Sequence, residues 1–510
     1  MAWVSGRSVI ALRCAGAAGS GAAAALAFAP HHLLALMPVG VAGLTWACFG
    51  ASRRLGAGAG ALFGFTFMMV LVPWLRVVGT DAWIAVAALQ AVFFALLGLG
   101  LAGVTRLPGW PLWAACLWVA LELARSRVPF GGFPWGRLAF ATVDWPVAAY
   151  SRVGGTAAVS AVLVLASNLA LWAVLNLARR RRFSKGNPAL AVGASLAALA
   201  VAVGAVLGGS LVSLSASPSG HTVVALVQGN VPQGGLRAYS QARAVLDNHA
   251  DATAALARAV AAGRQRAPNL VIWPESSTDI DPFADGSAAR QISSAVGAIG
   301  TPTLVGAVIS ERRTGARQNI GVVWDPVDGP GQRYVKRHAV PFGEYIPLRG
   351  VLAPFIDRLD QIAQDQASGS TPGILHMAGV RVGDVICFEV AYDGLVRDVV
   401  TAGAQLVVVQ TNNATYLDTG QLEQQWDISR LQAIQTGRVV AVAATNGISG
   451  FAAPDGRALA QAQPDTRALL VRRVALYEQT SLGVRLGEPL EGLLALLGLG
   501  AAVIGGVRRR

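Results

Sequence analysis

The sequence predicts a protein in two parts, a multi-pass α-helical membrane bundle of about eight spans and an α/β domain in the aqueous phase. Of its 510 residues, 54% are hydrophobic and only 14% are charged, against roughly 25% charged residues in average soluble domains. The apolar residues are also unevenly placed. Ala, Leu, Val and Gly dominate up to about position 212, whereas residues from about 220 to 486 have an ordinary globular composition. These differences indicate one lipid-solvated part and one aqueous part.

The net charge of +13 belongs to the hydrophobic part. Residues 217–487 contain 23 Lys and Arg against 23 Asp and Glu, so the other 18 basic and 5 acidic residues supply all of it. A nucleic-acid-binding protein would carry such an excess on a folded basic surface. Because the excess lies in loops between apolar segments, it favours orientation in a membrane, and no nucleic-acid partner is expected.

Segments long enough to cross a membrane occur eight times, since a transmembrane helix needs about 20 mostly apolar residues. The first candidate contains Arg13 and could be mistaken for a signal peptide. Six further spans follow it before the polar domain, so we interpret it as a retained helix. The candidates are roughly residues 9–29, 32–50, 57–76, 82–103, 110–126, 153–177, 189–212 and 489–506.

The basic residues also predict which side of the membrane each loop faces. With the N-terminus in the cytoplasm, the cytoplasmic segments hold 13 basic residues and the short outer loops hold 5. This is the bias that the positive-inside rule requires. Removing or adding one span would place either the cluster at 179–185 or the cluster at 508–510 outside. We therefore expect both termini in the cytoplasm and the polar domain on the outer side.

Strand-like and helix-like segments alternate in the polar domain, which indicates an α/β fold with buried sheets. Apolar β-rich runs bounded by Gly, Pro or Asn predict the strands. The segment 321–341 predicts a hairpin with its turn at "DGPG". The strands are expected within 222–230, 269–275, 301–310, 321–341, 379–390, 404–414 and 438–460, and helices over 241–263 and 421–438.

Three reactive or charged side chains lie at or near the ends of apolar strands: Glu275 in "VIWPE", Lys336 in "RYVKRHAVP" and Cys387 in "DVIC". An α/β fold exposes its chemistry at strand ends because the loops there form crevices. A thiol needs a base to take its proton or a cation to favour the thiolate. A carboxylate supplies the first, whereas an ammonium supplies the second and can also hold an oxyanion.

Each of these residues also has a purely structural interpretation. A cysteine at a strand end is commonly a small core residue, and a glutamate after proline or a lysine in a hairpin is commonly solvated. A disulfide is not expected, because Cys14, Cys48 and Cys116 all lie in predicted spans. A single unpaired cysteine in an oxidising compartment points to function. The six histidines show no metal-ligand spacing, so we expect no metal, and no cofactor.

Three motifs in this order, "WPES", "YVKRHAVPFGEYIP" and "ICFEVAY", resemble the Glu–Lys–Cys signature of the nitrilase superfamily. With flanking membrane spans, the "PFGEYIP" form resembles the apolipoprotein N-acyltransferase family. "GFPW" at 132–135 and "VALVQGNVPQ" at 224–233 are similar to other motifs of that family. The resemblance covers nearly the whole chain. It implies a membrane domain at 1–216, a nitrilase-like α-β-β-α catalytic domain at 217–487, and a last helix with an Arg tail at 488–510.

The resemblance implies a role for each residue of the signature. Glu275 would be the general base, Lys336 would stabilise the thiolate and the oxyanion, and Cys387 would be the nucleophile. The other motifs and loops give the expected substrate-binding residues, which are Trp135, Gln233, Tyr239, Asn412 and Asn413.

Three further residues would support this signature. Glu344 in "PFGEY" matches a second family glutamate that supports the lysine and the base. Glu389 matches the acidic residue two positions after the nucleophile. The backbone N–H of Phe388, by its position, would be the second donor to the oxyanion.

One stretch departs from the family pattern. After the strand "LVVVQ", many members have Asn-Asp-Ala-Trp-Phe and then a histidine before the next helix. This chain has "TNNATY" at 411–416, and "LEQQW" where the histidine would fall. Asn413 thus replaces an acid, and Gln424 or Gln425 replaces an imidazole. The departure leaves the signature intact but puts recognition of the acceptor in question.

The resemblance implies a two-step acyl transfer in the inner membrane of a bacterial cell. Cys387 would take an acyl chain from a phospholipid as a thioester, and the N-terminal amine of diacylglyceryl-cysteine in an apolipoprotein would then accept it. The expected partners are therefore the phospholipid donor, the apolipoprotein acceptor and the lipid bilayer. Two other functions stay open, a membrane-tethered amidase with the same three residues and a transporter or binding scaffold. The few ionisable groups in the predicted spans argue against transport.

Overall fold

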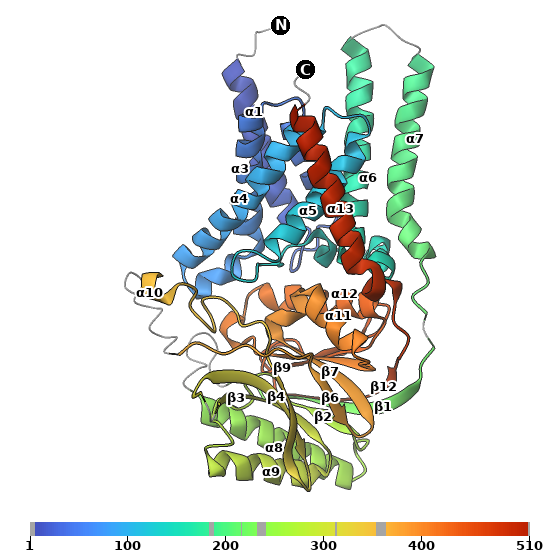
Figure 1. Ribbon diagram of the computed structural model, residues 1–510. Coiled ribbons are helices and arrows are strands. Elements are labelled where there is room, and N and C mark those ends of the chain that lie inside the picture. Colours follow the sequence, from blue (N-terminus) through green and yellow to red (C-terminus); the bar gives the residue numbers. More distant parts are fainter. Residues whose placement is uncertain are drawn as a thin grey trace. The chain divides into compact units, whose positions relative to one another are not determined.

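The structure is a computed structural model that describes residues 6–182, 188–215, 217–231, 241–311, 314–352 and 364–507. The chain divides into two compact units (Figure 1). Unit 1 is formed by Met1–Ser213 together with Leu482–Arg510, and unit 2 is formed by Leu214–Ser481.

Unit 1 is helical wherever the structure describes regular elements. Its α-helices are α1 (Gly6–Ala25), α2 (Leu36–Cys48), α3 (Arg53–Leu71), α4 (Thr80–Val104), α5 (Trp110–Arg125), α6 (Ser151–Arg182), α7 (Pro188–Leu207) and α13 (Leu482–Val507). Short 3-10 helices lie between them: η1 (Pro73–Val77), η2 (Leu138–Ala141), η3 (Pro146–Tyr150) and η4 (Gly208–Leu211).

Six segments of the described chain are long and apolar enough to cross a membrane: Ser8–Ala25, Arg53–Leu71, Thr80–Val104, Pro146–Ala178, Ala189–Leu211 and Leu482–Val507. Helices α2 and α5 lie within the second and fifth predicted spans but contain only 13 and 16 residues. At 1.5 Å per residue they measure about 20 and 24 Å, less than the roughly 30 Å of the hydrocarbon core. The protein is therefore a multi-pass membrane protein, and the count of eight spans stays a prediction.

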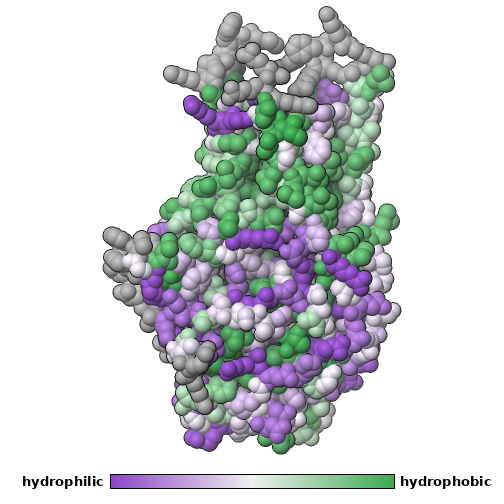
Figure 2. Space-filling model, viewed as in Figure 1, coloured by the Kyte–Doolittle hydropathy of each residue, from purple (hydrophilic) through white to green (hydrophobic). Residues whose placement is uncertain are grey.

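Large apolar side chains lie on the outer surfaces of these helices. Leu96, Leu190, Leu196, Leu496 and Val503 are each at least 60% exposed. Figure 2 shows hydrophobic residues gathered over the helices on the face in view, whereas hydrophilic residues dominate over the strands. Because soluble proteins rarely expose such wide apolar surfaces, the helices of unit 1 suit a lipid environment.

Inside unit 1, small residues let α3 and α4 approach each other closely. Gly56, Gly60 and Gly64 repeat every four residues along one face of α3. A Cβ atom on Gly60 would lie 2.0 Å from the carbonyl oxygen of Phe94 on α4. Small residues at this spacing are typical of helix pairs in membranes, where close backbone packing replaces the hydrophobic driving force.

Unit 2 contains two sheets of six strands each among its described residues. The first has the order β12 (Ala468–Leu476), β1 (Gly220–Gln228), β2 (Leu270–Ile272), β3 (Thr303–Ser310), β4 (Arg317–Asp325) and β5 (Gly329–Val335). The second has the order β11 (Ala458–Gln461), β10 (Gly450–Ala452), β9 (Val440–Ala444), β8 (Leu406–Thr411), β7 (Val380–Ile386) and β6 (Ile374–Met377).

Helices cover the outer faces of these sheets, which gives unit 2 four layers (Figure 1). The first sheet carries α8 (Ala242–Ala261) and α9 (Gly286–Ile299), and the second carries α11 (Asp393–Thr401) and α12 (Gln421–Thr436). Shorter helices are α10 (Arg349–Leu352), η8 (Cys387–Ala391) and η9 (Ala414–Tyr416). The predicted α/β fold is confirmed, and its layers follow the order α-β-β-α.

The central strands, such as β1 and β8, are apolar on both faces because both faces are buried. Val224 and Leu226 of β1 contact the core between the sheets, where they meet residues such as Val408 of β8. Ala225 and Val227 of the same strand lie in the second core beneath α8 and α9. A run without polar alternation is what a strand between two apolar layers requires.

The predicted position of the hairpin turn is wrong. Strand β4 ends at Asp325 and β5 already begins at Gly329, so the turn lies at 326–328 and part of "DGPG" belongs to the second strand. The Asp325 carboxylate accepts hydrogen bonds from the backbone N–H groups of Val327 and Asp328, at 2.8 and 3.1 Å. An aspartate that bonds to the backbone ahead of it favours a turn at that point.

Candidate active site

The residues predicted to be catalytic all follow the carboxyl ends of strands. Glu275 lies three residues after β2, Lys336 directly follows β5, and Cys387 directly follows β7. Thr411 is the last residue of β8, which is the neighbour of β7. The first two therefore come from the first sheet and the last two from the second, so the site is assembled across the sandwich.

Glu275, Lys336 and Glu344 form a charged cluster. The Lys336 Nζ lies 2.9 Å from Glu275 Oε1 and 2.8 Å from Glu344 Oε1. The side chains of Lys336, Glu275 and Glu344 are only 3%, 6% and 13% exposed. A buried ammonium needs nearby counter-charges to offset its lost hydration, and the two carboxylates supply them. The cluster therefore fixes the position of all three charges.

Two asparagines hold the carboxylates of this charged cluster in place. Asn319 Nδ2, on β4, donates to Glu275 Oε1 at 2.7 Å and to Glu344 Oε1 at 3.1 Å. The backbone N–H of Asn412 donates to Glu275 Oε2 at 2.9 Å. Both oxygens of Glu275 thus accept hydrogen bonds, which fixes the carboxylate in one orientation.

The electrostatics of Lys336 follow from this geometry. Burial by itself would lower the pKa of the Lys336 ammonium, but the charges of Glu275 and Glu344 outweigh burial and hold the pKa well above its usual range. Lys336 therefore remains a cation at any physiological pH. It can stabilise negative charge on a neighbouring sulfur or oxygen, and it cannot act as a base.

Cys387 has an unusual backbone conformation for a non-glycine residue, with φ of 54°. Positive φ values carry strain for side-chain-bearing residues, and such residues cluster at functional sites. Burial, and next the charge of Glu275, raise the pKa of the Cys387 thiol to about 12, although Lys336 acts in the opposite direction. Cys387 is therefore a thiol at neutral pH. It needs a base to take its proton, and the neighbouring carboxylate of Glu275 has the chemistry to do so.

Glu389 ties the segment after β5 to the turn that carries Cys387. Its carboxylate accepts hydrogen bonds from the Tyr334 hydroxyl, at 2.9 and 3.0 Å, and from the backbone N–H groups of Arg337 and His338, at 2.7 and 2.9 Å. It also accepts from the N–H of Ile386 at 2.8 Å. Glu389 is fully buried. It thus fixes the spacing between the lysine and the cysteine.

Asn413 lies in a buried network of side-chain amides, which we call the amide network (Asn413, Gln421 and Gln425). Asn413 Nδ2 donates to Gln421 Oε1 at 2.9 Å and to Gln425 Oε1 at 2.7 Å. Gln421 Nε2 also donates to Gln425 Oε1 at 3.0 Å. Asn413, and Gln425 as one of the two candidates for the second departure from the family pattern, are therefore in direct contact in this chain.

The other predicted site residues lie in several places. Trp135 is buried in unit 1 and packs edge-on against Trp74, with ring centroids 5.7 Å apart. The ring of Phe388 contacts Tyr392, with centroids 5.5 Å apart. Gln233 and Tyr239 lie outside the described residues. The structure thus brings Glu275, Lys336, Glu344, Cys387, Glu389 and Asn412 into one connected region, and the substrate-binding roles stay predictions.

Three residues of the site were not singled out from the sequence. Asn319 bridges the two carboxylates, Tyr334 bonds to Glu389, and the Thr411 hydroxyl lies 3.3 Å from the Cys387 sulfur. Asn319 carried one signal, because it is a polar residue at the start of the apolar strand "NIGVVW". A polar side chain buried in a strand needs a partner, and here the partners are the carboxylates of Glu275 and Glu344.

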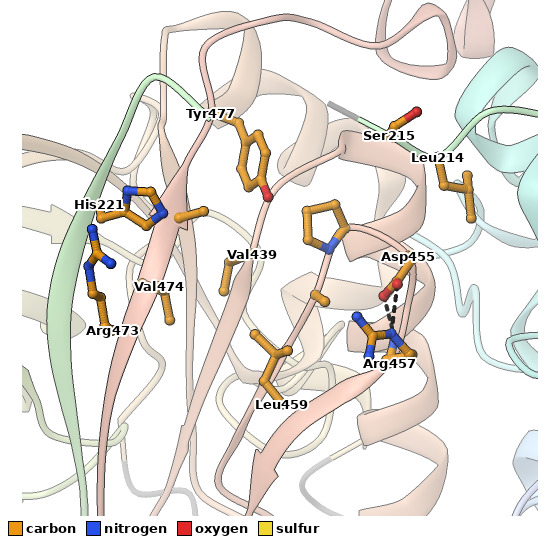
Figure 3. Close-up of a pocket in the computed structure, with 13 residues that line it drawn as sticks. Leu214, Ser215, His221, Val439, Asp455, Arg457, Leu459, Arg473, Val474 and Tyr477 are labelled. Atoms are coloured by element: carbon orange, nitrogen blue, oxygen red, sulfur yellow. Dashed lines mark hydrogen bonds and ion pairs between the residues drawn. The ribbon is translucent and has the colours of Figure 1, made fainter. Parts of the chain in front are cut away.

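A separate cavity of about 440 Å³ lies elsewhere in unit 2 (Figure 3). His221 and Arg473, from β1 and β12, line one side of it, and the ion pair of Asp455 and Arg457 lines the other. None of the described residues that line it belongs to the charged cluster, and Cys387 is not among them. We therefore assign the chemistry to the strand-end site and not to this cavity.

Sequence comparison places unit 2 in a class of enzymes. Residues 223–481 match the carbon-nitrogen hydrolase family, and residues 20–169 match the N-terminal domain of apolipoprotein N-acyltransferase. A solved amidase from Nesterenkonia sp. covers 52% of this chain with 93% of its own length, at 19% identity and a TM-score of 0.37. The family match over residues 223–481 shows that unit 2 is a carbon-nitrogen hydrolase domain.

Full-length relatives define the family more closely. An apolipoprotein N-acyltransferase of Mycolicibacterium smegmatis is 39% identical over 96% of this chain and 85% of its own length. Those of Methylococcus capsulatus and Pseudomonas aeruginosa are 30% and 28% identical, over 86% and 94% of this chain and over 85% and 91% of their own lengths. The chain belongs to the apolipoprotein N-acyltransferase family.

Proposed function

We propose that this protein transfers an acyl chain from a phospholipid to the N-terminal amine of diacylglyceryl-cysteine in an apolipoprotein, through a thioester on Cys387. Family membership supports the activity. The observation that carries the mechanism is the buried charged cluster, in which Lys336 is held between two carboxylates beside a thiol of raised pKa. These groups match the needs of a thiol that must lose its proton only when it attacks.

In the first half-reaction, Cys387 attacks the ester carbonyl of the phospholipid. Glu275 accepts the thiol proton as the sulfur–carbon bond forms. The carbonyl oxygen becomes an oxyanion, which the Lys336 ammonium and the backbone N–H of Phe388 stabilise. When the intermediate collapses, the carbon–oxygen bond to the glycerol breaks and Glu275 returns its proton to that oxygen. A lysophospholipid leaves, and a thioester remains on Cys387.

In the second half-reaction, the free amine of diacylglyceryl-cysteine attacks the thioester carbonyl. Glu275 takes a proton from the attacking nitrogen, and the same two donors hold the second oxyanion. The carbon–sulfur bond then breaks and the proton passes to the sulfur, which restores the Cys387 thiol. Because one carboxylate serves both halves in turn, a single site is sufficient for a ping-pong reaction.

The membrane location fits substrates that are both lipids. Moving an acyl chain through water costs roughly 0.8 kcal/mol for each CH₂ group, so an enzyme that receives lipids laterally from a bilayer avoids this cost. We assign membrane insertion to residues 1–216 and 488–510 and catalysis to residues 217–487. The bias of basic residues supports an arrangement with both termini in the cytoplasm and catalysis outside the inner membrane.

The order of addition tests the transfer directly. Purified enzyme is incubated with phospholipid vesicles alone, and a diacylglyceryl-cysteinyl peptide is added afterwards. A transferase releases free fatty acid only slowly before the peptide is added and forms N-acylated peptide rapidly afterwards, since it must keep water off the thioester. Steady release of fatty acid without peptide product would contradict the proposal and leave a hydrolase, such as a membrane-tethered amidase.

A further inference from the structure

The hydroxyl of Thr411 contacts the proposed nucleophile. Its Oγ1 lies 3.3 Å from Cys387 Sγ, and Thr411 is 1% exposed. The residue is the last one of β8, and the preceding residue Gln410 pairs in register with Ile386, the residue before the cysteine. The parallel strands β7 and β8 therefore deliver the thiol and the hydroxyl side by side.

The hydrogen bonds around Thr411 determine where its proton points. Gln425 Nε2 donates to Thr411 Oγ1 at 2.9 Å, so this oxygen already accepts a hydrogen bond. The hydroxyl proton can then go to the Cys387 sulfur at 3.3 Å or to Asn413 Oδ1 at 3.4 Å. A distance of 3.4 Å is long for a bond between two oxygens, whereas sulfur, with its larger radius, accepts hydrogen bonds at greater distances. The geometry thus favours donation to the sulfur.

The amide network fixes this orientation from behind. The amide nitrogens of Asn413 and Gln421 both donate to Gln425 Oε1, at 2.7 and 3.0 Å. With its oxygen occupied in this way, Gln425 presents its nitrogen to Thr411 and cannot turn round without losing these bonds. Asn413, Gln421 and Gln425 are 3%, 5% and 3% exposed. Every member is uncharged, so the orientation of the hydroxyl does not change with pH.

We propose that Thr411 is a further catalytic residue, whose hydroxyl donates a hydrogen bond to the Cys387 sulfur in an orientation set by the amide network. This role rests on the proposed function of Cys387 as the nucleophile. As Glu275 takes the thiol proton, negative charge develops on the sulfur, and a hydrogen bond to a charged acceptor is stronger than one to a neutral acceptor. Thr411 keeps its own proton throughout. Its hydrogen bond stabilises the negative charge on the sulfur until the sulfur–carbon bond forms.

The test measures the reactivity of Cys387 separately from acyl transfer. The full-length protein in detergent is treated with iodoacetamide between pH 7 and pH 10, and the alkylated Cys387 peptide is quantified by mass spectrometry. Thr411→Val removes the hydroxyl but keeps the shape of the side chain, and valine, like threonine, favours strands. Loss of one bond to a charged group lowers the thiolate fraction roughly tenfold or more, and the more basic sulfur is a better nucleophile, which offsets part of the loss. We expect alkylation about three- to tenfold slower at each pH.

Two further variants separate the hydroxyl from its support. Thr411→Ser keeps the donor, so most of the alkylation rate should return. Gln425→Leu keeps the hydroxyl but removes the group that orients it, and the rate should fall between those of the wild type and Thr411→Val. Thr436→Val is the matched control. Thr436 is fully buried on α12 and its hydroxyl donates to the Gln432 carbonyl at 2.6 Å, away from the thiol, so the rate should equal that of the wild type.

The outcomes distinguish this proposal from the proposed function. Wild-type alkylation of Cys387 in Thr411→Val would overturn the role of Thr411, whatever the lipid assays show. Wild-type alkylation in Gln425→Leu would overturn the orienting role of the amide network. Slower alkylation in Thr411→Val, restored by Thr411→Ser, supports the proposal even if the wild-type protein forms no N-acylated peptide. That last result would contradict only the acyl transfer.

Discussion

The two sheets contribute very different halves to the candidate site. The first sheet supplies the charged cluster, in which the Lys336 Nζ lies within 2.9 Å of both the Glu275 and the Glu344 carboxylate. The second supplies a neutral half, made of the Cys387 thiol, the Thr411 hydroxyl and the amide network. Most of these side chains are buried, and Cys387 is half-buried, so the main difference between the two halves is their charge.

This difference suggests a division of work. In the proposed mechanism, the charged half accepts a proton and stabilises an oxyanion, and the attraction of Lys336 to the two carboxylates fixes these groups before substrate arrives. The neutral half holds the sulfur in place without converting it to a thiolate, because burial raises the pKa of Cys387 to about 12. A sulfur that stays protonated until substrate binds is protected from oxidation and from unwanted acceptors.

The largest effect is expected from Cys387→Ser, which removes the proposed nucleophile from the neutral half and leaves the charged half intact. A serine hydroxyl has a much higher pKa than a thiol, so Glu275 cannot activate it. Acyl transfer should fall by more than about a thousandfold, while the thermal unfolding midpoint in detergent should barely change. If the variant retained even a tenth of the wild-type rate, Cys387 would not be the nucleophile.

The next effect concerns the shape of the cation in the charged half. Lys336→Arg preserves the charge, yet the larger planar guanidinium cannot occupy the compact site between Glu275 and Glu344. We expect turnover to fall roughly a hundredfold or more, nearly as far as in Lys336→Ala. The measurement is the rate of N-acylation of a diacylglyceryl-cysteinyl peptide. Arg337→Lys is the control, because Arg337 pairs with Asp398 outside the cluster.

Near-normal turnover in Lys336→Arg would show that only charge is required there. The charged half would then act only through its net charge, and the short distances within the charged cluster would not be required for catalysis.

A smaller effect is expected where the halves are joined. Burial raises the pKa of Glu389. That shift is opposed by hydrogen bonds from the Ile386 N–H, the His338 N–H and the Tyr334 hydroxyl, and by the charge of Lys336. Glu389→Gln replaces one of the two acceptor oxygens with a donor that faces other donors. We expect a loss of about 3 kcal/mol of stability, seen as a lower unfolding midpoint. An unchanged midpoint would mean that Glu389 is already protonated in the folded protein.

The smallest effect concerns Asp384, which lies on β7 and is fully buried. Burial, and next the charges of Glu389 and Glu275, hold the pKa of Asp384 well above its usual range. Its Oδ2 and the Oε1 of Gln410 both lie within 2.5 Å of the point where a Cβ on Gly321 would be. Among the described residues, neither carboxylate oxygen of Asp384 nor the Gln410 Oε1 has a hydrogen-bond partner, so a neutral acid or amide costs less at this position than a carboxylate does.

The sign of the pH dependence follows from this raised pKa. The folded protein binds the Asp384 proton more tightly than the unfolded chain does, so its stabilising effect is complete below the ordinary aspartate pKa and is lost as pH rises through the raised value. Asp384→Asn removes that loss. We expect an unfolding midpoint a few degrees higher than that of the wild type at pH 8, with the difference vanishing as pH falls towards 4.

Asp251→Asn, on the exposed side of α8, is the control for this pH series and should show no such divergence. A midpoint for Asp384→Asn that stays parallel to that of the wild type at every pH would show that Asp384 is not protonated in the folded protein.

Local patterns predicted the strand ends that carry the chemistry, because apolar runs mark buried strands wherever they lie in the fold. They did not predict β12, whose sequence "ALLVRRVAL" mixes charged and apolar residues and whose partner β1 lies more than 200 residues earlier. Asn319 was missed for a similar reason, since its bond to Glu275 joins residues 44 positions apart. Such contacts depend on how strands and sheets far apart in the sequence pack together, and no local periodicity in the sequence predicts them.

The stretch that departs from the family pattern shows the same limit. The sequence indicated substitutions at Asn413 and at Gln424 or Gln425, but it could not show that Asn413 contacts Gln425 or that Gln425 donates to Thr411. The β8–α12 connection and the first turn of α12 separate Asn413 from Gln425 along the chain, and only the folded structure brings the two side chains into contact. The residue type was visible in the sequence, and its hydrogen-bond partner was not.

One measurement tests the thioester mechanism most directly. The purified protein is exposed to phospholipid vesicles without an acceptor, and its intact mass is recorded before and after treatment with hydroxylamine. The mechanism predicts that the intact mass increases by one acyl group, which hydroxylamine removes and which Cys387→Ser does not acquire. No acyl adduct, or an adduct that persists in Cys387→Ser, would contradict it.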